Sequence, residues 1–234
     1  MDKMFIRPKL SANTLDTFYI RSKIFEFINA SLPKLKENLL DVGCGKMPYR
    51  AYILNHTTVN KYTGLDIDNA ITYDAEVSAD IKWDGIKMPI NDAEYTSVMA
   101  TEVLEHCPHP NQILSEIYRV MKTNGVFIFT VPFLWNLHET PHDEYRYTPF
   151  ALQRLLGDAG FKDIRIRPTG GWHASMAQMI GLWVCRAPMP GKLRWLLKRL
   201  VLPFYRYLLK KDKVSTNYSE GLMITGICGL AYKK

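Results

Sequence analysis

An apolar run that ends in Asp-x-Gly-x-Gly, from Leu39 to Gly45, constrains the fold of this chain most strongly. Such a run is typical of a buried strand followed by a sharp turn, because glycine adopts backbone conformations that other residues disfavour and lets a ligand approach the main chain. Asp66 follows 21 positions after Gly45, at the end of a second apolar run. A carboxylate at the tip of the next strand is suited to accept both hydroxyls of a ribose. The spacing therefore predicts a pocket for an adenosine-bearing cofactor.

The residues after the turn indicate which cofactor the pocket takes. A dinucleotide fingerprint needs a third glycine three positions after Gly45, where this chain has Pro48, and the Gly-Lys-Ser/Thr of a triphosphate-binding loop does not follow. The remaining motif, from Asp41 to Gly45, resembles motif I of the class I S-adenosylmethionine (SAM) methyltransferases, although Met47 replaces the third glycine of that pattern. The alternative is a strand, turn and helix that bind no ligand.

Alternating strand and helix patterns predict an α/β fold with a doubly wound, mostly parallel sheet of seven strands. The resemblance implies that this sheet is of the Rossmann-like methyltransferase type. The apolar content of 47% and the charged content of 23% are those of a folded chain, and 234 residues suit one domain, 1–234. Within it we expect an N-terminal helical segment at 13–36 and a helical insertion at 170–219 before the last strand. The expected strands are 38–43, 61–66, 76–81, 95–100, 126–131, 162–167 and 220–232. The expected helices are 13–30, capped by Asn13 or Thr14, 48–55, 110–122, ended by Asn124-Gly125, and 148–159, capped by Thr148.

Two further motifs extend the resemblance from about Leu39 to Phe161. Residues 101–106, Thr-Glu-Val-Leu-Glu-His, and 116–125, Glu-Ile-Tyr-Arg-Val-Met-Lys-Thr-Asn-Gly, look like linked motifs of the same methyltransferase family. The resemblance implies SAM as the cofactor. It also implies a cofactor-binding set of Asp41, Gly43, Cys44, Gly45, Asp66, Ile67, Asp80, Ile81 and Thr101.

The resemblance assigns a contact to most members of this set. Gly43 and Gly45 would pass under the methionine part, while Asp66 binds the ribose. Asp80, with Ile81, would end the third strand beside the adenine, although a turn or cap role is the alternative for Asp80. For the others, the resemblance implies that Ile67 covers the adenine and that Thr101 faces the methionine.

The loop after the fifth strand contains a sequence that mimics a metal site. His138-Glu139-x-x-His142 matches the zinc-protease signature, which works only where both histidines share one helix face. Pro141 disfavours a helix there. We therefore expect no metal site in this loop. The four cysteines, which form no C-x-x-C pair, predict neither a disulfide nor a zinc site.

The same loop is expected to contact the methyl acceptor. Methyl transfer needs alignment of the acceptor atom with the sulfonium, and an acceptor hydroxyl also needs a base. His142 beside Asp143 is the first candidate for this base, and His138 with Glu139 is the second. The segment that follows offers two residues to position the substrate, Tyr145 and Arg146. A salt-bridged lid without a role in proton transfer is the alternative. The loop resembles that of bacterial methyltransferases associated with cell-surface glycan synthesis.

The positive charge of the chain is confined to one segment. Residues 186–213 contain nine Lys or Arg and one acid, whereas the rest of the chain has a net charge of −1. An amphipathic helix with cationic flanks favours docking to an anionic membrane surface. A helical cap over the substrate or a homodimer contact is the second interpretation. Nucleic-acid contact is disfavoured, because bulky aliphatic residues alternate with the cations.

These patterns together predict methyl transfer from SAM to an oxygen of a small-molecule, saccharide or lipid-linked acceptor. The first eight residues lack the apolar stretch of a secretory signal, so we expect a cytoplasmic protein that docks peripherally at the inner membrane face. Two alternatives stay open at this point. One is an RNA methyltransferase that uses the basic segment, and the other is a SAM-binding regulatory protein without turnover.

Overall fold

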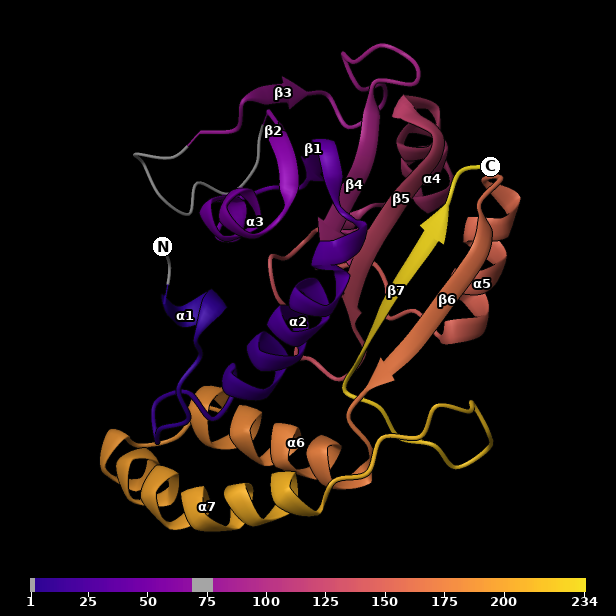
Figure 1. Ribbon diagram of the computed structural model, residues 1–234. Coiled ribbons are helices and arrows are strands. Elements are labelled where there is room, and N and C mark those ends of the chain that lie inside the picture. The colour runs from indigo at the N-terminus through magenta and orange to yellow at the C-terminus, as the bar shows by residue number, and fades with distance from the viewer. Residues whose placement is uncertain (1–2, 69–77) are drawn as a thin grey trace.

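The computed structural model describes residues 3–68 and 78–234, and its centre is a seven-stranded sheet with the order β3-β2-β1-β4-β5-β7-β6 (Figure 1). All pairings among β1 to β5 are parallel, and β7 runs antiparallel to both of its neighbours. The predicted doubly wound, mostly parallel sheet is therefore confirmed. The strands are β1 (Lys36–Val42), β2 (Thr58–Ile67), β3 (Ile81–Trp83), β4 (Tyr95–Thr101), β5 (Met121–Pro132), β6 (Lys162–Thr169) and β7 (Gly226–Tyr232).

Helices cover both faces of this sheet (Figure 1). One face packs against α2 and α3, and the opposite face packs against α4 and α5. The helices are α1 (Lys3–Ile6), α2 (Phe18–Ser31), α3 (Arg50–His56), α4 (Pro110–Val120), α5 (Pro149–Asp158), α6 (Trp172–Arg186) and α7 (Gly191–Lys211), with 3₁₀ turns η1 (Leu32–Lys34) and η2 (Leu104–His106).

The two-residue period of the strands explains why the sheet needs helices on both sides. Leu40 packs into the cluster with α4 and α5, whereas the preceding Leu39 packs into the cluster with α2 and α3. On β5, Phe127 and Ile128 divide between the two clusters in the same way. Successive side chains of a strand point to opposite faces, so a continuous apolar run is buried only when both faces are covered.

Two helix boundaries differ from the sequence expectation. The first long helix begins at Phe18, after Thr17, and not at the predicted cap of Asn13 or Thr14. The helix α4 ends at Val120, and β5 begins at once, so the predicted stop at Asn124-Gly125 is wrong. Asn124 does adopt a left-handed conformation, with φ of 63°, but it lies within the strand and donates its N–H to the carbonyl of Lys233.

The third strand is shorter and later than predicted. Its expected range of 76–81 includes positions 76 and 77, which lie outside the described residues, and the strand observed begins at Ile81. The cap at the start of α5 agrees with the sequence, because the hydroxyl of Thr148 accepts the N–H of Ala151.

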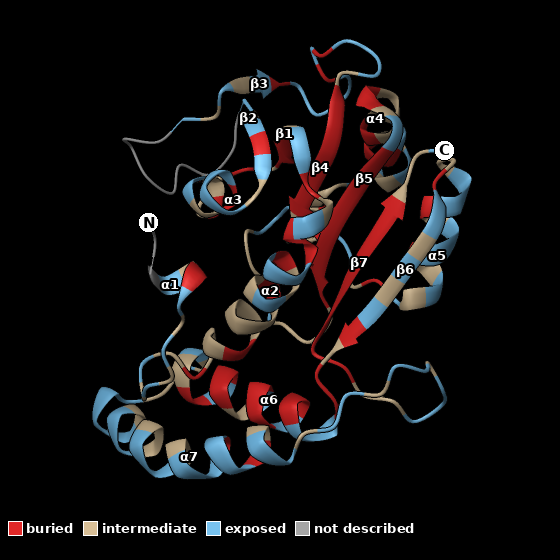
Figure 2. Ribbon diagram, in the orientation of Figure 1, coloured by how far each residue is buried: buried red, intermediate tan, exposed pale blue. Residues whose placement is uncertain are grey.

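The segment between β6 and β7 contains α6 and α7, which pack side by side below the sheet end where β6 finishes (Figure 1). Leu15, from the chain before α2, is buried between them. A Cβ on Gly181 would lie 2.2 Å from the carbonyl oxygen of Leu15, so this close packing requires glycine in α6. The helix α7 continues through Pro203, and much of its outer surface is exposed (Figure 2). Among the helices of residues 3–68 and 78–234, none has the length and apolar character to cross a membrane.

Candidate functional site

The glycine turn after β1 has a conformation that only glycine adopts without strain. Gly43 has φ of 64° and Gly45 has φ of 49°, both in the left-handed region. The N–H groups of Gly43 and Cys44 donate to the carbonyl of Leu65 on β2, at 2.8 and 3.1 Å. A Cβ on Gly43 would lie only 2.5 Å from a methyl group of Val103. The turn is thus closely packed between β2 and the segment that follows β4.

Asp66 faces this turn from β2, as the sequence predicts. Its Oδ2 accepts the N–H of Gly45 at 2.8 Å, and its Oδ1 accepts the N–H of Ile67 at 2.9 Å. Burial raises the pKa of Asp66, although these two hydrogen bonds oppose the shift. A carboxylate has about four acceptor positions, so each oxygen can still accept a hydroxyl. Ile67 is 44% exposed and offers an apolar surface beside the carboxylate.

Two residues of motif I are more deeply buried than their neighbours. The carboxyl of Asp41 is buried on the face of the sheet toward α3 and accepts the hydroxyl of Tyr62, while burial raises its pKa to about 7. Burial likewise raises the pKa of the Cys44 thiol, and three nearby acids raise it further.

Asp80 does not lie at the end of the third strand, so its predicted place is wrong. In the register of β2 with β3, Leu65 pairs with Ile81, and Trp83 is the last residue of the strand. Asp80 therefore precedes β3, where it accepts the N–H of Gly64 at 2.8 Å and contacts Arg50 at 3.1 Å.

Asp84 occupies the end of β3 that the sequence analysis assigned to Asp80. Its carboxylate is exposed and accepts the N–H groups of Ile86 and Lys87, which hold its pKa below the ordinary value. The signal in the sequence was the apolar Trp83 directly before an Asp-Gly pair, which is typical of a strand that ends in a turn. The predicted third strand, 76–81, ended before Trp83, so the turn signal was not read as the end of a strand.

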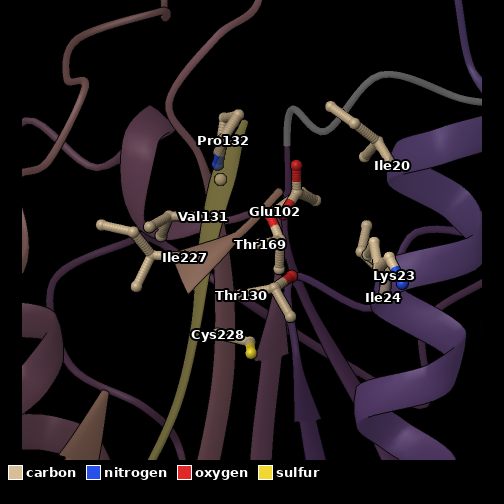
Figure 3. Close-up of a pocket in the computed structure, with 11 residues that line it drawn as sticks. Ile20, Lys23, Ile24, Glu102, Thr130, Val131, Pro132, Thr169, Ile227 and Cys228 are labelled. Atoms are coloured by element: carbon tan, nitrogen blue, oxygen red, sulfur yellow. The ribbon is translucent and has the colours of Figure 1, made fainter. Parts of the chain in front are cut away.

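Thr101 ends β4 opposite Thr130 of β5, and Glu102 follows it with φ of 56°. The N–H of Glu102 donates to the carbonyl of Thr130 at 3.0 Å, which fixes this unusual conformation. Burial raises the pKa of Glu102 to about 7 against the opposing effects of the Thr130 hydroxyl and nearby arginines. Figure 3 shows Glu102 and Thr130 at a small cavity that faces Ile20 and Lys23 of α2.

Beyond Glu102, the turn η2 and the loop after β5 bring together three acids and two histidines, which we call the carboxylate–histidine cluster: Glu105, His106, His138, Glu139 and Asp143. The rings of His106 and His138 meet edge to face, with centroids 4.7 Å apart. His106 Nε2 lies 3.8 Å from Glu105 Oε1 and 3.6 Å from Glu139 Oε2. His138 Nδ1 lies 3.3 Å from Asp143 Oδ2.

Burial and hydrogen bonds shift the pKa values of the groups in the cluster. Glu105 is fully buried, and burial together with the nearby Glu102 raises its pKa well above the ordinary value. Burial also lowers the pKa of His138, an effect that Asp143 opposes. Burial would raise the pKa of Asp143 too, but hydrogen bonds from Arg146 and the His138 N–H outweigh it and hold the pKa at about 2.

The histidines of the loop contact other acids than the sequence predicts. His142 is exposed, and its backbone carbonyl accepts a hydrogen bond from His106 Nδ1 at 2.8 Å. Asp143 lies 3.3 Å from His138, and Glu139 lies 3.6 Å from His106, so these contacts differ from the predicted pairs of His142 with Asp143 and His138 with Glu139.

Sequence reasoning missed Glu105 and His106 as site residues, although both stand in the second family motif. Only the fold brings them to the loop after β5.

The two residues predicted to bind substrate contact the protein itself. Arg146 forms two hydrogen bonds with Asp143, at 2.6 and 2.8 Å. The hydroxyl of Tyr145 donates to the carbonyl of Pro108, and its ring stacks on Tyr147. These contacts fix the loop as an ordered, salt-bridged segment beside the cluster.

Comparison with known sequences identifies a domain within the chain. Residues 40–129 match the family described as a methyltransferase domain. The ubiquinone biosynthesis O-methyltransferase of Rickettsia akari is 32% identical over 124 residues, which cover 50% of this chain and 48% of that protein. A sterol 24-C-methyltransferase of Kluyveromyces lactis is 27% identical over 142 residues, covering 53% of this chain and 36% of that protein. The chain thus spans about half or less of the length of these relatives.

Solved structures share the fold over nearly the whole chain. A SAM-dependent methyltransferase from Archaeoglobus fulgidus superimposes with a TM-score of 0.58 at 17% identity, over 99% of this chain and 97% of that one. Phosphoethanolamine N-methyltransferase 2 of Haemonchus contortus, in complex with SAM, gives a TM-score of 0.57 at 14% identity, over 91% of this chain and 52% of that one. These likenesses show the fold, and the domain match supports SAM as the cofactor.

Proposed function

We propose, on the premise that residues 40–129 form a SAM-dependent methyltransferase domain, that this protein transfers the methyl group of SAM to an oxygen of a small-molecule, saccharide or lipid-linked acceptor. One observation carries the proposal. The glycine turn and the carboxylate of Asp66 face one another across the carboxyl ends of β1 and β2, and the carboxylate–histidine cluster follows β4 on the same edge of the sheet. Parallel α/β sheets bind their ligands at this edge, where the strand order reverses.

The residues at this edge fit the chemistry of the cofactor. Bound SAM supplies a methyl group on a positively charged sulfur, which is open to displacement. Asp66 accepts the ribose hydroxyls, and Ile67 covers one face of the base. Gly43 keeps the turn free of a side chain, since a Cβ there would collide with Val103. At the end of β3, Asp84 takes the adenine contact that the sequence analysis assigned to Asp80.

The cluster activates the acceptor oxygen. Holding two reacting groups in line supplies up to about 7–11 kcal/mol of the barrier reduction, and acid–base help at the hydroxyl adds about 10²–10⁴-fold. Of the three residues proposed from the sequence, His138 lies beside Asp143, which accepts its backbone N–H at 3.1 Å, whereas His142 is exposed. We therefore assign acceptor activation to His138, with Asp143 and Arg146 as positioning residues.

Calorimetry and turnover test these assignments separately. Titration with SAM and with S-adenosylhomocysteine should give one site per chain. Asp66→Asn should weaken the binding of both ligands. With a phenolic or sugar acceptor that supports turnover, His138→Gln should lower kcat by about 10²-fold or more, while the matched His142→Gln retains activity. Absence of SAM binding would refute the proposal. Equal activity of both histidine variants would refute the role of His138.

A second proposal concerns the surface of α6 and α7, which we propose docks on an anionic membrane. Five exposed apolar side chains of α7 follow one stripe: Leu193 (45% exposed), Leu196 (46%), Leu200 (64%), Phe204 (50%) and Tyr207 (54%). A sixth, Trp195, lies outside the stripe beneath Arg199. Along one edge of this stripe are four exposed cations, Lys192, Arg199, Arg206 and Lys210. An apolar stripe flanked by cations is the pattern that interfacial helices present to anionic lipid.

Co-sedimentation tests this surface. The wild type should pellet with phosphatidylglycerol vesicles but not with phosphatidylcholine vesicles, and added salt should release it. Reversal of Lys192, Arg199 and Arg206 to Glu should abolish pelleting, whereas the same reversal at the exposed Lys36, Lys87 and Lys162 should not. Binding to tRNA instead would favour nucleic-acid contact, and binding to neither would leave the helices as a cap or a dimer contact.

A further inference from the structure

We propose that Glu105, His106 and His138 bind one divalent transition-metal ion at the acceptor end of the site. A carboxylate oxygen of Glu105 and a ring nitrogen of each histidine lie within 4.8 Å of one another. Two ligands at right angles around an ion, at about 2.1 Å each, are roughly 3 Å apart, so small side-chain rotations close the site. The three residues come from η2 and from the loop after β5, two segments that the parallel pairing of β4 with β5 places side by side.

The burial of Glu105 points independently to a ligand. Its side chain is fully buried, and within residues 3–68 and 78–234 neither of its carboxylate oxygens has a hydrogen-bond partner. Buried polar groups are almost always hydrogen-bonded, because their removal from water is otherwise costly. The nearest cationic candidate is His106 Nε2, at 3.8 Å from Oε1, which is beyond hydrogen-bond distance. A bound cation would satisfy this carboxylate.

The histidines have the supporting contacts of metal ligands. His106 Nδ1 lies 2.8 Å from the carbonyl oxygen of His142, so the N–H belongs on Nδ1 and Nε2 keeps its lone pair on the side of Glu105. His138 Nδ1 lies 3.3 Å from Asp143 Oδ2, although within residues 3–68 and 78–234 the two atoms form no hydrogen bond, and Arg146 holds that carboxylate in place. Metal-bound histidines commonly direct their second nitrogen toward a carbonyl or a carboxylate in this way.

The surrounding charges and the donor atoms select the ion. Two further acids lie near the three ligands: Glu139 Oε2 is 3.6 Å from His106 Nε2, and Glu102 precedes η2 by two residues. Surroundings of this composition favour a cation. Two imidazoles with one carboxylate suit Zn²⁺, Mn²⁺ or Fe²⁺ and disfavour Mg²⁺ and Ca²⁺, which prefer oxygen ligands.

The role of this ion rests on the methyl transfer proposed above. An acceptor hydroxyl that coordinates the ion becomes more acidic and loses its proton to a base in the solvent. The oxygen lone pair then forms the bond to the methyl carbon, while the electrons of the carbon–sulfur bond move to the sulfur and leave a neutral thioether. In this scheme His138 holds the ion that activates the acceptor, so no histidine has to remove the proton.

Metal titration of the full chain tests the site without turnover. After removal of bound metal with a chelator, calorimetry with Zn²⁺ and with Mn²⁺ should give one site per chain, while Mg²⁺ should bind more weakly. Glu105→Gln and His138→Gln should each lower the Zn²⁺ affinity by about 100-fold or more, since loss of a supporting residue alone costs about 10–100-fold. His109→Gln, an exposed histidine three positions after His106, is the matched control and should bind as the wild type does.

Several results would overturn the site. No Zn²⁺ or Mn²⁺ binding at millimolar concentration would do so, as would affinities that the Glu105 and His138 variants leave unchanged. Thermal melts check folding, and His106→Gln, which alters a less buried ligand, repeats the test if Glu105→Gln does not fold. SAM titration of the wild-type chain separates the two proposals. A wild-type protein that binds SAM but neither Zn²⁺ nor Mn²⁺ refutes the ion alone, whereas a wild-type protein that binds metal but not SAM refutes the methyltransferase function.

Discussion

Replacement of Gly43 by alanine tests the account of the glycine turn. A left-handed backbone costs a residue with a Cβ about 1–2 kcal/mol. The new Cβ would also lie 2.5 and 2.8 Å from the two methyl groups of Val103, and overpacking of this kind costs about 1–3 kcal/mol. The expected loss of unfolding free energy is therefore about 2–5 kcal/mol, which corresponds to a Tm decrease of roughly 5–15 °C for a chain of this size. The displaced turn should also weaken SAM binding by at least about tenfold.

Scanning calorimetry and SAM titration measure both effects. Gly157→Ala in α5 is the matched control, because the new Cβ would meet no other heavy atom of residues 3–68 and 78–234 within 4 Å and should add about 0.5–1 kcal/mol of stability. A double variant, Gly43→Ala with Val103→Ala, should recover the part of the loss that comes from the clash and leave the backbone strain. Wild-type Tm and SAM affinity in Gly43→Ala would refute the packed, left-handed turn.

Three further predictions concern single side chains. Asp66→Asn should weaken SAM binding in calorimetry by about 1.5–3 kcal/mol, the usual effect of losing hydrogen bonds to a charged group, and an unchanged Kd would argue against the ribose contact. The pKa of Asp41 is raised from 3.8 to about 7, so the folded state keeps its proton longer than the unfolded chain, and stability falls as pH rises from about 4 to 7. Asp41→Asn should remove this pH dependence and stabilise the protein above pH 7 by up to roughly 4 kcal/mol. If the unfolding free energy of Asp41→Asn, measured by denaturation at several pH values, changed with pH as that of the wild type does, the prediction would be contradicted. Thr148→Ala should cost about 1 kcal/mol in urea unfolding through loss of the cap on α5, whereas Thr148→Ser should not.

The sheet, the glycine turn and the position of Asp66 beside it could be predicted because their signals are local. An apolar run, two glycines and an acid at a fixed spacing define β1, the turn and Asp66 without reference to the rest of the chain. The third strand was misplaced because it has only three residues, Ile81–Trp83, too few for a two-residue period to establish its ends. The error placed Asp80, and not Asp84, at the end of this strand.

The acceptor end could not be predicted, because its contacts join segments that are distant in the sequence. The sequence pairs each of His142 and His138 with the acid that follows it, yet in the fold the side chain of His138 lies beside Asp143, and His142 is exposed. Its partner His106 lies in η2, after β4. The pairing of β4 with β5 places these two segments together, and no local pattern in either of them records that pairing.

A crystal structure with S-adenosylhomocysteine bound tests the central claim most directly. The account predicts that the ribose hydroxyls lie within hydrogen-bond distance of Asp66, that the amino-acid part passes Gly43 and Gly45, and that the sulfur faces the carboxylate–histidine cluster. An empty crevice at saturating ligand, or a nucleoside bound elsewhere while Asp66 contacts only the N–H groups of Gly45 and Ile67, would contradict it.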